Sequence, residues 1–146
     1  MKFLVLCSLA LMSATAHADS VFQGFSGISS ASALSTSDQI LAKAFKLKTS
    51  GFMIKFKGAV IRKLPDDNDG SRHQKFIVKL ASGQTLLIAH NINLAPRVAG
   101  LRVGNAVTIY GEYIWNHGGG IVHKTHHTPD GSKGGGWIRH KDVIYQ

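Results

Sequence analysis

The chain has 146 residues, of which 17 are lysine or arginine and 8 are aspartate or glutamate, so its formal net charge is +9. This length fits one domain with a single hydrophobic core, and the single cysteine, Cys7, excludes a fold held by internal disulfides. The positive charge favours anionic partners such as nucleic acid, lipid headgroups or acidic polysaccharide, although simple solubility explains it equally well.

The first 18 residues have the pattern of an export signal. Lys2 precedes an apolar run from Phe3 to Ala14, and Ala16-His17-Ala18 has the small-x-small spacing of a cleavage site. A retained membrane helix is the alternative, but the run is shorter than the about 20 apolar residues needed to span a bilayer. Cleavage would remove Lys2 and Cys7, leaving a cysteine-free chain of charge +8. We therefore expect an exported protein, either periplasmic or secreted.

Residues 19 to 35 are rich in Ser, Ala and Gly with few large apolar groups, which predicts a flexible lead-in. A helical pattern follows. Thr36 and Gln39 have the spacing of a capping box, apolar residues recur at helical intervals from Ile40 to Phe45, and Gly51 can end the element. We expect one short amphipathic helix there, at the start of a single domain over residues 36 to 146.

Beyond Gly51 the apolar period becomes two, which predicts strands. The first strand spans about residues 52 to 63, with Gly58 as a bend or bulge. An Asx-rich turn at 66 to 70 precedes a second strand near 75 to 80, and Ser82-Gly83 turns the chain into a third at 86 to 89. Residues 91 to 101 predict a crossing loop, followed by strands near 107 to 113 and 121 to 122 and a last apolar segment from 137 to 145.

Three strands, a crossover and two more strands is the element order of the OB-fold. The sequence therefore predicts a mainly β fold, a small five-stranded OB-like Greek-key barrel preceded by a short amphipathic helix. A small open β-roll or sandwich is the alternative, because the same number of strands permits it. Neither fold names a function.

Polar residues gather at the predicted strand ends, where loops of a closed barrel can meet at one rim. Imidazoles that deprotonate water and guanidinium groups that stabilise a charged phosphate suit hydrolysis. The candidate catalytic residues are His73, His90, Arg72 and Arg97. The candidate binding residues are Arg72, Lys75, Asn91, Arg97, Trp115 and Trp137, the two Trp rings as platforms for stacked bases. Solvated or paired surface groups are the alternative for the charged members.

Two groups of residues are candidate ligands of a divalent metal ion. Asp66 and Asp67 offer carboxylate oxygens, although these residue types also suit an ordinary turn. His123, His126 and His127 offer imidazole nitrogens, with exposed or hydrogen-bonded histidines as the alternative. On a strand His123 and His127 would share a face while His126 pointed away, so a metal site there needs loop geometry or other ligands.

Several linked motifs together resemble a known family. They are Leu64-Pro65-Asp66-Asp67, Gly70-Ser71-Arg72-His73-Gln74-Lys75-Phe76, Ala89-His90-Asn91-Ile92, Leu94-Ala95-Pro96-Arg97 and Gly111-Glu112-Tyr113. Over residues 40 to 146 the chain resembles DUF3465, a family of uncharacterised exported bacterial proteins, and the resemblance implies no activity. Lys124, Thr128 and Lys133 stand where the family pattern has Trp, Asp and His, which removes two potential metal ligands or proton carriers.

Three functional hypotheses follow. The first is an exported OB-like domain that binds an anionic polymer, above all nucleic acid, with a steep dependence on salt. The second is a metal-assisted hydrolase, a small nuclease-like enzyme that uses the His, Asp and Arg residues at the barrel rim with a divalent ion. The third is an envelope adaptor or stress protein whose polar cluster only rigidifies a loop.

Overall fold

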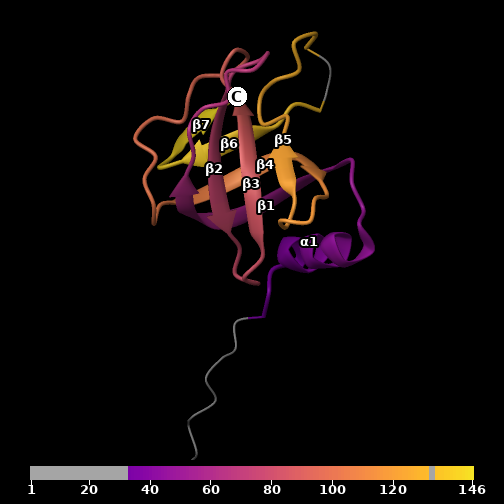
Figure 1. Cartoon of the computed structure of the whole chain (residues 1–146). Helices are drawn as coiled ribbons and strands as arrows, with labels where there is room; N and C mark the ends of the chain where they lie inside the picture. Colours follow the sequence, from indigo (N-terminus) through magenta and orange to yellow (C-terminus); the bar gives the residue numbers. More distant parts are fainter. Residues whose placement is uncertain (1–32, 132–133) are drawn as a thin grey trace, which may run out of the picture. The chain divides into compact units, whose positions relative to one another are not determined.

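The computed structural model describes residues 33–131 and 134–146, in which one helix precedes seven strands (Figure 1). The expected export signal and most of the predicted lead-in lie outside these residues. The elements are α1 (Thr36–Leu47), β1 (Phe52–Lys63), β2 (His73–Lys79), β3 (Thr85–Asn91), β4 (Ala106–Ile114), β5 (Ile121–His123), β6 (Trp137–His140) and β7 (Val143–Tyr145). Within this part of the chain, no helix is both long and apolar enough to cross a membrane.

Helix α1 has different caps from those that the sequence predicts. Ser35, rather than Thr36, is the N-cap, and its hydroxyl accepts a hydrogen bond of 3.1 Å from the backbone N–H of Asp38. The buried Asp38 carboxylate also accepts from the backbone N–H of Ser82, at 3.1 Å, in the turn between β2 and β3. Asp38 is therefore held at the third position of the helix, where its backbone N–H can bond to Ser35 as the N-cap. The helix ends at Leu47 because Lys48 adopts a left-handed φ of 55°, so Gly51 lies outside it.

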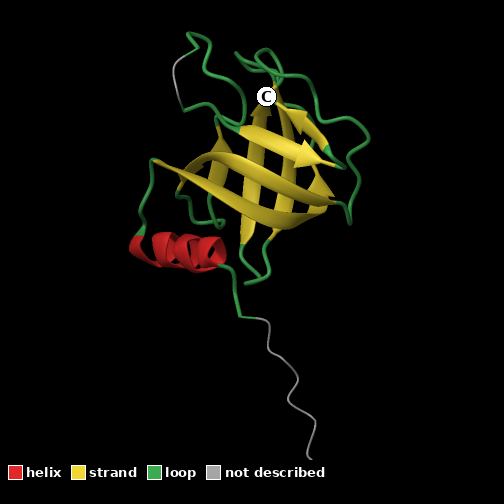
Figure 2. Ribbon diagram, turned by 180° about the vertical axis from the view of Figure 1, so that it is seen from behind, coloured by secondary structure: helices red, strands yellow, loops and turns green. Residues whose placement is uncertain are grey.

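Five strands close into a barrel, which confirms the predicted fold class. Their order is β1-β2-β3-β5-β4, and β4 pairs again with β1. The pair β3 and β5 is parallel, whereas the four other pairs of the barrel are antiparallel. This is the connectivity of a five-stranded OB-type Greek-key barrel. Figure 2 shows the barrel from behind, with α1 at one of its ends.

Strand β1 serves two partners, and this closes the barrel. Residues 52 to 59 pair with β4, while residues 59 to 63 pair with β2. Gly58 lies next to the change of partner, where a Cβ atom would come within 3.2 Å of the Lys79 carbonyl oxygen and of the Val78 Cβ atom. The irregular register lies further on, between Val60 and Arg62. Gly58 therefore permits a close approach of two backbones, and the bulge is a separate feature.

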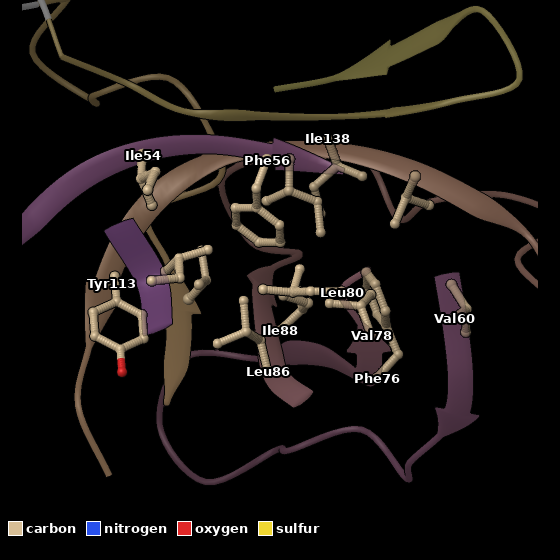
Figure 3. Close-up of a cluster of buried hydrophobic side chains, with 14 of the residues drawn as sticks. Ile54, Phe56, Val60, Phe76, Val78, Leu80, Leu86, Ile88, Tyr113 and Ile138 are labelled. Atoms are coloured by element: carbon tan, nitrogen blue, oxygen red, sulfur yellow. The ribbon is translucent and has the colours of Figure 1, made fainter. Parts of the chain in front are cut away.

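The barrel interior is filled by alternate residues of its strands (Figure 3). In β2 and β3 every second side chain is buried, as the period of two predicts. Leu41 and Ala44 of α1 join the same core. Each fully buried aliphatic or aromatic side chain stabilises the fold by about 1.5–3 kcal/mol relative to an exposed one. The buried residues are Ile54, Phe56, Val60, Phe76, Val78, Leu80, Leu86, Ile88, Val98, Leu101, Val107, Ile109, Tyr113, Val122 and Ile138, with Leu41 and Ala44.

A C-terminal hairpin adds two strands beyond the five that the sequence predicts. Strand β6 pairs antiparallel with residues 108 to 110 of β4, and β7 pairs with β6. Its Ile138 is fully buried in the core. The apolar segment from 137 to 145 is therefore part of the sheet, and its short strands alternate too briefly to be recognised from the sequence.

Candidate functional site

The loops that carry the predicted rim residues lie at the end of the barrel away from α1 (Figure 1). Arg97, in the loop between β3 and β4, forms an ion pair with Asp66, in the loop between β1 and β2. The Nε atom of Arg72 donates to the side-chain oxygen of Asn93 at 2.9 Å. These contacts tie loops to one another. The structure thus brings part of the predicted rim set together, as pairs that hold loops in place.

Asp67 is the centre of the turn between β1 and β2. Its Oδ1 accepts from the backbone N–H of Asp69 at 3.2 Å, and its backbone exchanges hydrogen bonds with His73. The bond from Asp69 is the main cause that lowers the pKa of Asp67, and the charge of Lys75 lowers it further. The Nζ atom of Lys75 lies 3.6 Å from this carboxylate. The geometry is that of an Asx turn whose negative charge is already compensated.

His73 and Asn91 are opposite one another in the β2–β3 ladder, at the ends of their strands. Both side chains are half-buried. Asn91 closes a turn of its own, because its side-chain oxygen accepts from the backbone N–H of Asn93 at 2.9 Å. His73 lines a hollow of about 320 Å³ on the outer side of the sheet, together with Lys75 and His123. Among the predicted catalytic histidines, His73 is the one that a ligand can reach.

His90 is fully buried, and both of its ring nitrogens have partners. Its Nε2 atom lies 3.0 Å from the carbonyl oxygen of Pro96 and must donate, so Nδ1 accepts from the hydroxyl of Thr125 at 2.8 Å. Burial lowers the pKa of His90, which keeps the ring neutral. This ring joins the loop after β3 to the loop after β5. The arrangement fits a structural role better than that of a general base.

The three histidines after β4 do not converge. His123 lies 2.9 Å from Glu112, the Nδ1 atom of His126 donates to the carbonyl oxygen of His127 at 2.6 Å, and the His127 ring is exposed. In residues 33–131 and 134–146, no three His, Cys, Asp or Glu side chains are close enough to share a metal ion. Asp67 and His123 line the same hollow as His73, but the predicted set of Asp66, Asp67, His123, His126 and His127 does not form a metal site.

Glu112 was not a predicted site residue, yet it links two basic groups. Its Oε2 atom lies 2.7 Å from Nζ of Lys124 and 2.9 Å from Nε2 of His123. The hydrogen bond from Lys124 is the main cause that lowers the pKa of Glu112. Lys124 thus compensates an outward carboxylate of β4. The sequence could have indicated this contact, because Glu112 is an acidic residue within a strand of alternating apolar residues.

Trp115 attaches α1 to the barrel. Its indole N–H donates to the backbone oxygen of Phe45 at 3.0 Å, and its ring stacks on the Phe45 ring with centroids 6.4 Å apart. The Nζ atom of Lys48 lies 5.4 Å from the centroid of the Trp115 ring. The N–H group is therefore bonded within the chain and the ring packs against the hydrophobic core, so Trp115 is a poor platform for a ligand.

Trp137 belongs to a different surface, formed by the outward residues of β1, β4 and β6. Trp137 is opposite Tyr110, and Tyr110 is opposite Lys55. The Trp137 and Tyr110 ring centroids are 6.2 Å apart with an angle of 47° between the planes, and the Arg139 guanidinium lies 5.7 Å from the Trp137 ring. We call this surface the cation–aromatic face. It consists of Lys55, Lys57, Thr108, Tyr110, Trp137 and Arg139.

The cations of this face have no ion-pair partner among the described residues. The salt bridges of this part of the chain involve Lys75, Arg97, Lys124 and His123, all on other surfaces. Lys55, Lys57 and Arg139 are exposed. They were not predicted, although their alternation with buried neighbours was visible in the sequence. Their juxtaposition could not be predicted, since it depends on the pairing of β6 with β4.

The topology and these exposed cations define a small basic barrel protein of the OB type. A family model matches residues 24–146. The chain therefore belongs to the family described as "Protein of unknown function (DUF3465)", which confirms the resemblance seen in its motifs. No curated protein matches the chain.

Proposed function

We propose that this chain binds an anionic polymer, specifically single-stranded nucleic acid, on the cation–aromatic face. The observation that carries the proposal is the strand pairing, which places cations beside aromatic rings on one surface. Lys55, Tyr110 and Trp137 are opposite one another across β1, β4 and β6, and so are Lys57, Thr108 and Arg139. Proteins that bind single strands combine cations along the phosphates with aromatic rings on which bases stack. This face offers both within six neighbouring positions of three strands.

The face is a better anion site than the rim because its charges are uncompensated. At the rim a phosphate would compete with Asp66 for Arg97 and with Asp67 for Lys75. On the face, no carboxylate of the described residues forms an ion pair with Lys55, Lys57 or Arg139. An incoming phosphate therefore displaces only water and counterions there, and counterion release favours binding.

The two rings favour a single strand over a duplex. Their planes are inclined by 47°, so the Tyr110 and Trp137 rings offer two separate surfaces for successive unstacked bases. The bases of a duplex are stacked on one another and are not available to such rings. The proposed setting is outside the cytoplasm, in the periplasm or the medium, and rests on the signal pattern of residues 1 to 18.

The test is fluorescence anisotropy of a labelled oligothymidylate with the purified protein over a series of salt concentrations. Three phosphate contacts predict a slope of about −2 for log K against log salt. The double variant Lys55→Gln/Lys57→Gln should bind about tenfold more weakly and reduce the steepness of that slope to about −0.7. A matched control with the same loss of charge is Lys43→Gln/Lys46→Gln, on the exposed side of α1.

Two results would contradict the proposal. One is equal binding by the face variant and the α1 control, which would indicate attraction by net charge alone. The other is loss of binding in an Arg72→Gln/Arg97→Gln variant while the face variant binds like the unchanged protein. That result would place the contact at the rim.

A further inference from the structure

A second feature lies next to the cation–aromatic face, where the β6–β7 hairpin pairs with β4. The structure has a hollow of about 420 Å³ there. Its lining includes Lys57, Thr108 and Arg139, which also belong to the face, so hollow and face are continuous. The remaining polar lining residues are Asn105, His140, Lys141 and Asp142.

Asn105 lines this hollow, and hydrogen bonds to its side-chain oxygen fix the orientation of the amide group. Its oxygen accepts from the backbone N–H of Arg102 at 2.9 Å, which identifies the oxygen side of the amide. The same oxygen lies 3.0 Å from the Nε2 atom of the buried His140, which therefore donates to it. The Nδ2 atom has no acceptor among the described residues and is not a buried atom. Two N–H donors are thus oriented and available to a ligand.

The charges around the hollow favour an anion. Lys57, Arg139 and Lys141 contribute three cations against the single carboxylate of Asp142, and none of these four groups forms an ion pair with another described residue. All four side chains are exposed. A compact anion with several acceptor oxygens can therefore meet both the amide donors and the cations.

The tip of the hairpin supports a ligand-binding role. Lys141 and Asp142 both adopt left-handed backbone conformations, with φ of 49° and 54°. A two-residue hairpin turn of this kind favours Asn-Gly, because side chains with a Cβ atom disfavour positive φ. Strained residues of this kind cluster at functional sites. Here the turn brings one cation, Lys141, and one carboxylate, Asp142, into the lining of the hollow.

We propose that this hollow is a phosphate-binding subsite, in which the Asn105 amide donates to phosphate oxygens and Lys57, Arg139 and Lys141 compensate their charge. The inference rests on the proposed function for its setting, because the phosphate belongs to a strand that lies on the cation–aromatic face. That phosphate is either at the end of the strand or within it. The two sources share the same tetrahedral anion chemistry.

The first experiment uses inorganic phosphate, so it does not depend on nucleic-acid binding. Phosphate is titrated into ¹⁵N-labelled protein against chloride at equal ionic strength, and the Asn105 amide and the Arg139 Nε signals are followed. Both signals should shift saturably. In Asn105→Asp the retained oxygen still accepts from Arg102 and His140, while a charged oxygen replaces the donors. This variant should lose about tenfold in phosphate affinity.

Two further variants complete the design. Lys46→Gln on α1 changes the net charge by the same amount as Asn105→Asp and should bind phosphate normally. Asp142→Asn removes the one carboxylate of the hollow and should tighten phosphate binding severalfold, which keeps the test decisive if Asn105→Asp fails to fold. Unchanged phosphate affinity in Asn105→Asp or in Asp142→Asn overturns the proposal, as do shifts spread evenly over all surface cations.

The second experiment identifies the source of the phosphate. One oligothymidylate is compared with a 5′-phosphate, a 3′-phosphate or two hydroxyl ends. A tighter complex with one phosphorylated end, lost in Asn105→Asp, assigns the subsite to a terminal phosphate. Equal binding of all three, weakened equally in Asn105→Asp, assigns it to a phosphodiester. Phosphate binding without oligonucleotide binding would leave the subsite standing and reject the proposed function.

Discussion

The barrel rim and the cation–aromatic face are both basic, but their cations have different surroundings. At the rim Arg97 pairs with Asp66, Lys75 lies beside Asp67 and Lys124 contacts Glu112. On the face Lys55, Lys57 and Arg139 have no ion-pair partner in the part of the chain that the structure describes. The number of cations therefore does not identify a binding surface. What distinguishes the two regions is whether a carboxylate already compensates the charge.

The physical reason for this difference is the backbone beneath each region. The rim is formed largely by loops, whose conformations depend on side-chain contacts such as those of Arg72 with Asn93 and His90 with Pro96. The face lies on strands, whose positions are fixed by ladder hydrogen bonds and by the side chains on their inner surface. Outward side chains on a strand are not needed to hold the fold, so they are available to a ligand.

The largest expected effect tests the structural role of the rim. His90→Ala should destabilise the protein by about 2–4 kcal/mol, because it leaves a cavity and removes two buried hydrogen bonds. Chemical denaturation measures this loss. Binding of oligothymidylate by the folded fraction should stay unchanged, since His90 is remote from the face in the sheet. A His90→Ala protein that is stable but no longer binds oligothymidylate would place the binding site at the rim and not on the face.

The next effect tests the face. Trp137→Ala should weaken oligonucleotide binding by about 1–3 kcal/mol, the usual contribution of one stacked base. Anisotropy titration at fixed salt measures the change. Trp137→Phe retains an aromatic ring and should recover part of the affinity, whereas a purely electrostatic surface would show no difference between Phe and Ala. Equal affinities of the three proteins would remove Trp137 from the site.

A pH dependence follows from the buried His90. Burial lowers its pKa in the folded protein below the ordinary value of 6.5. Above that pH both states are neutral at this residue, so its contribution to stability is complete. As the pH falls below 6.5 the unfolded chain binds a proton that the folded protein refuses, and stability falls by up to about 1.4 kcal/mol per pH unit.

The measurement is urea denaturation between pH 8 and 5, with His90→Gln as the comparison. The difference in free energy of unfolding between the two proteins should be constant above about pH 6.5 and should shrink below it. A constant difference over the whole range would show that His90 has the same pKa in both states.

The smallest effect tests the exposed ion pair of the rim. Arg97→Gln should change the free energy of unfolding by about 0–1 kcal/mol, because about half of the Arg97 side chain is exposed and solvent screens the pair with Asp66. Oligonucleotide affinity should change no more than it does in a single α1 variant such as Lys46→Gln. A loss matching that of Lys55→Gln/Lys57→Gln would return Arg97 to the binding site.

Local patterns were sufficient to predict most of the barrel. The alternation of Phe52, Ile54 and Phe56 predicts β1, and the Asx turn and Ser82-Gly83 predict the connections on either side of β2. These signals are local because a strand alternates residue by residue and a turn depends on its own side chains. The N-cap of α1 could not be predicted from such local patterns, since Ser35 and Thr36 are equally suitable capping residues. The distant contact of Asp38 with Ser82 favours Ser35.

The candidate site was harder to predict because it depends on contacts between distant residues. Trp115 and Trp137 look alike in the sequence, as rings near polar turns. Trp115 contacts α1, 70 residues earlier in the chain, while Trp137 is opposite Tyr110 on an open surface. Likewise, His73 and His90 are similar candidates until the ladder places one on the outer surface and the other in the interior.

By itself, the sequence determined the basic charge, the family, the helix followed by strands, and the alternation that separates core from surface. The tertiary structure decided which cations are paired, which tryptophan packs against the core and which histidine is buried. The physical reason is the range of each interaction. Alternation and turn formation act within a few residues. The cation–aromatic face exists only because Lys55 of β1 and Trp137 of β6, 82 residues apart in the chain, are both opposite Tyr110 of β4.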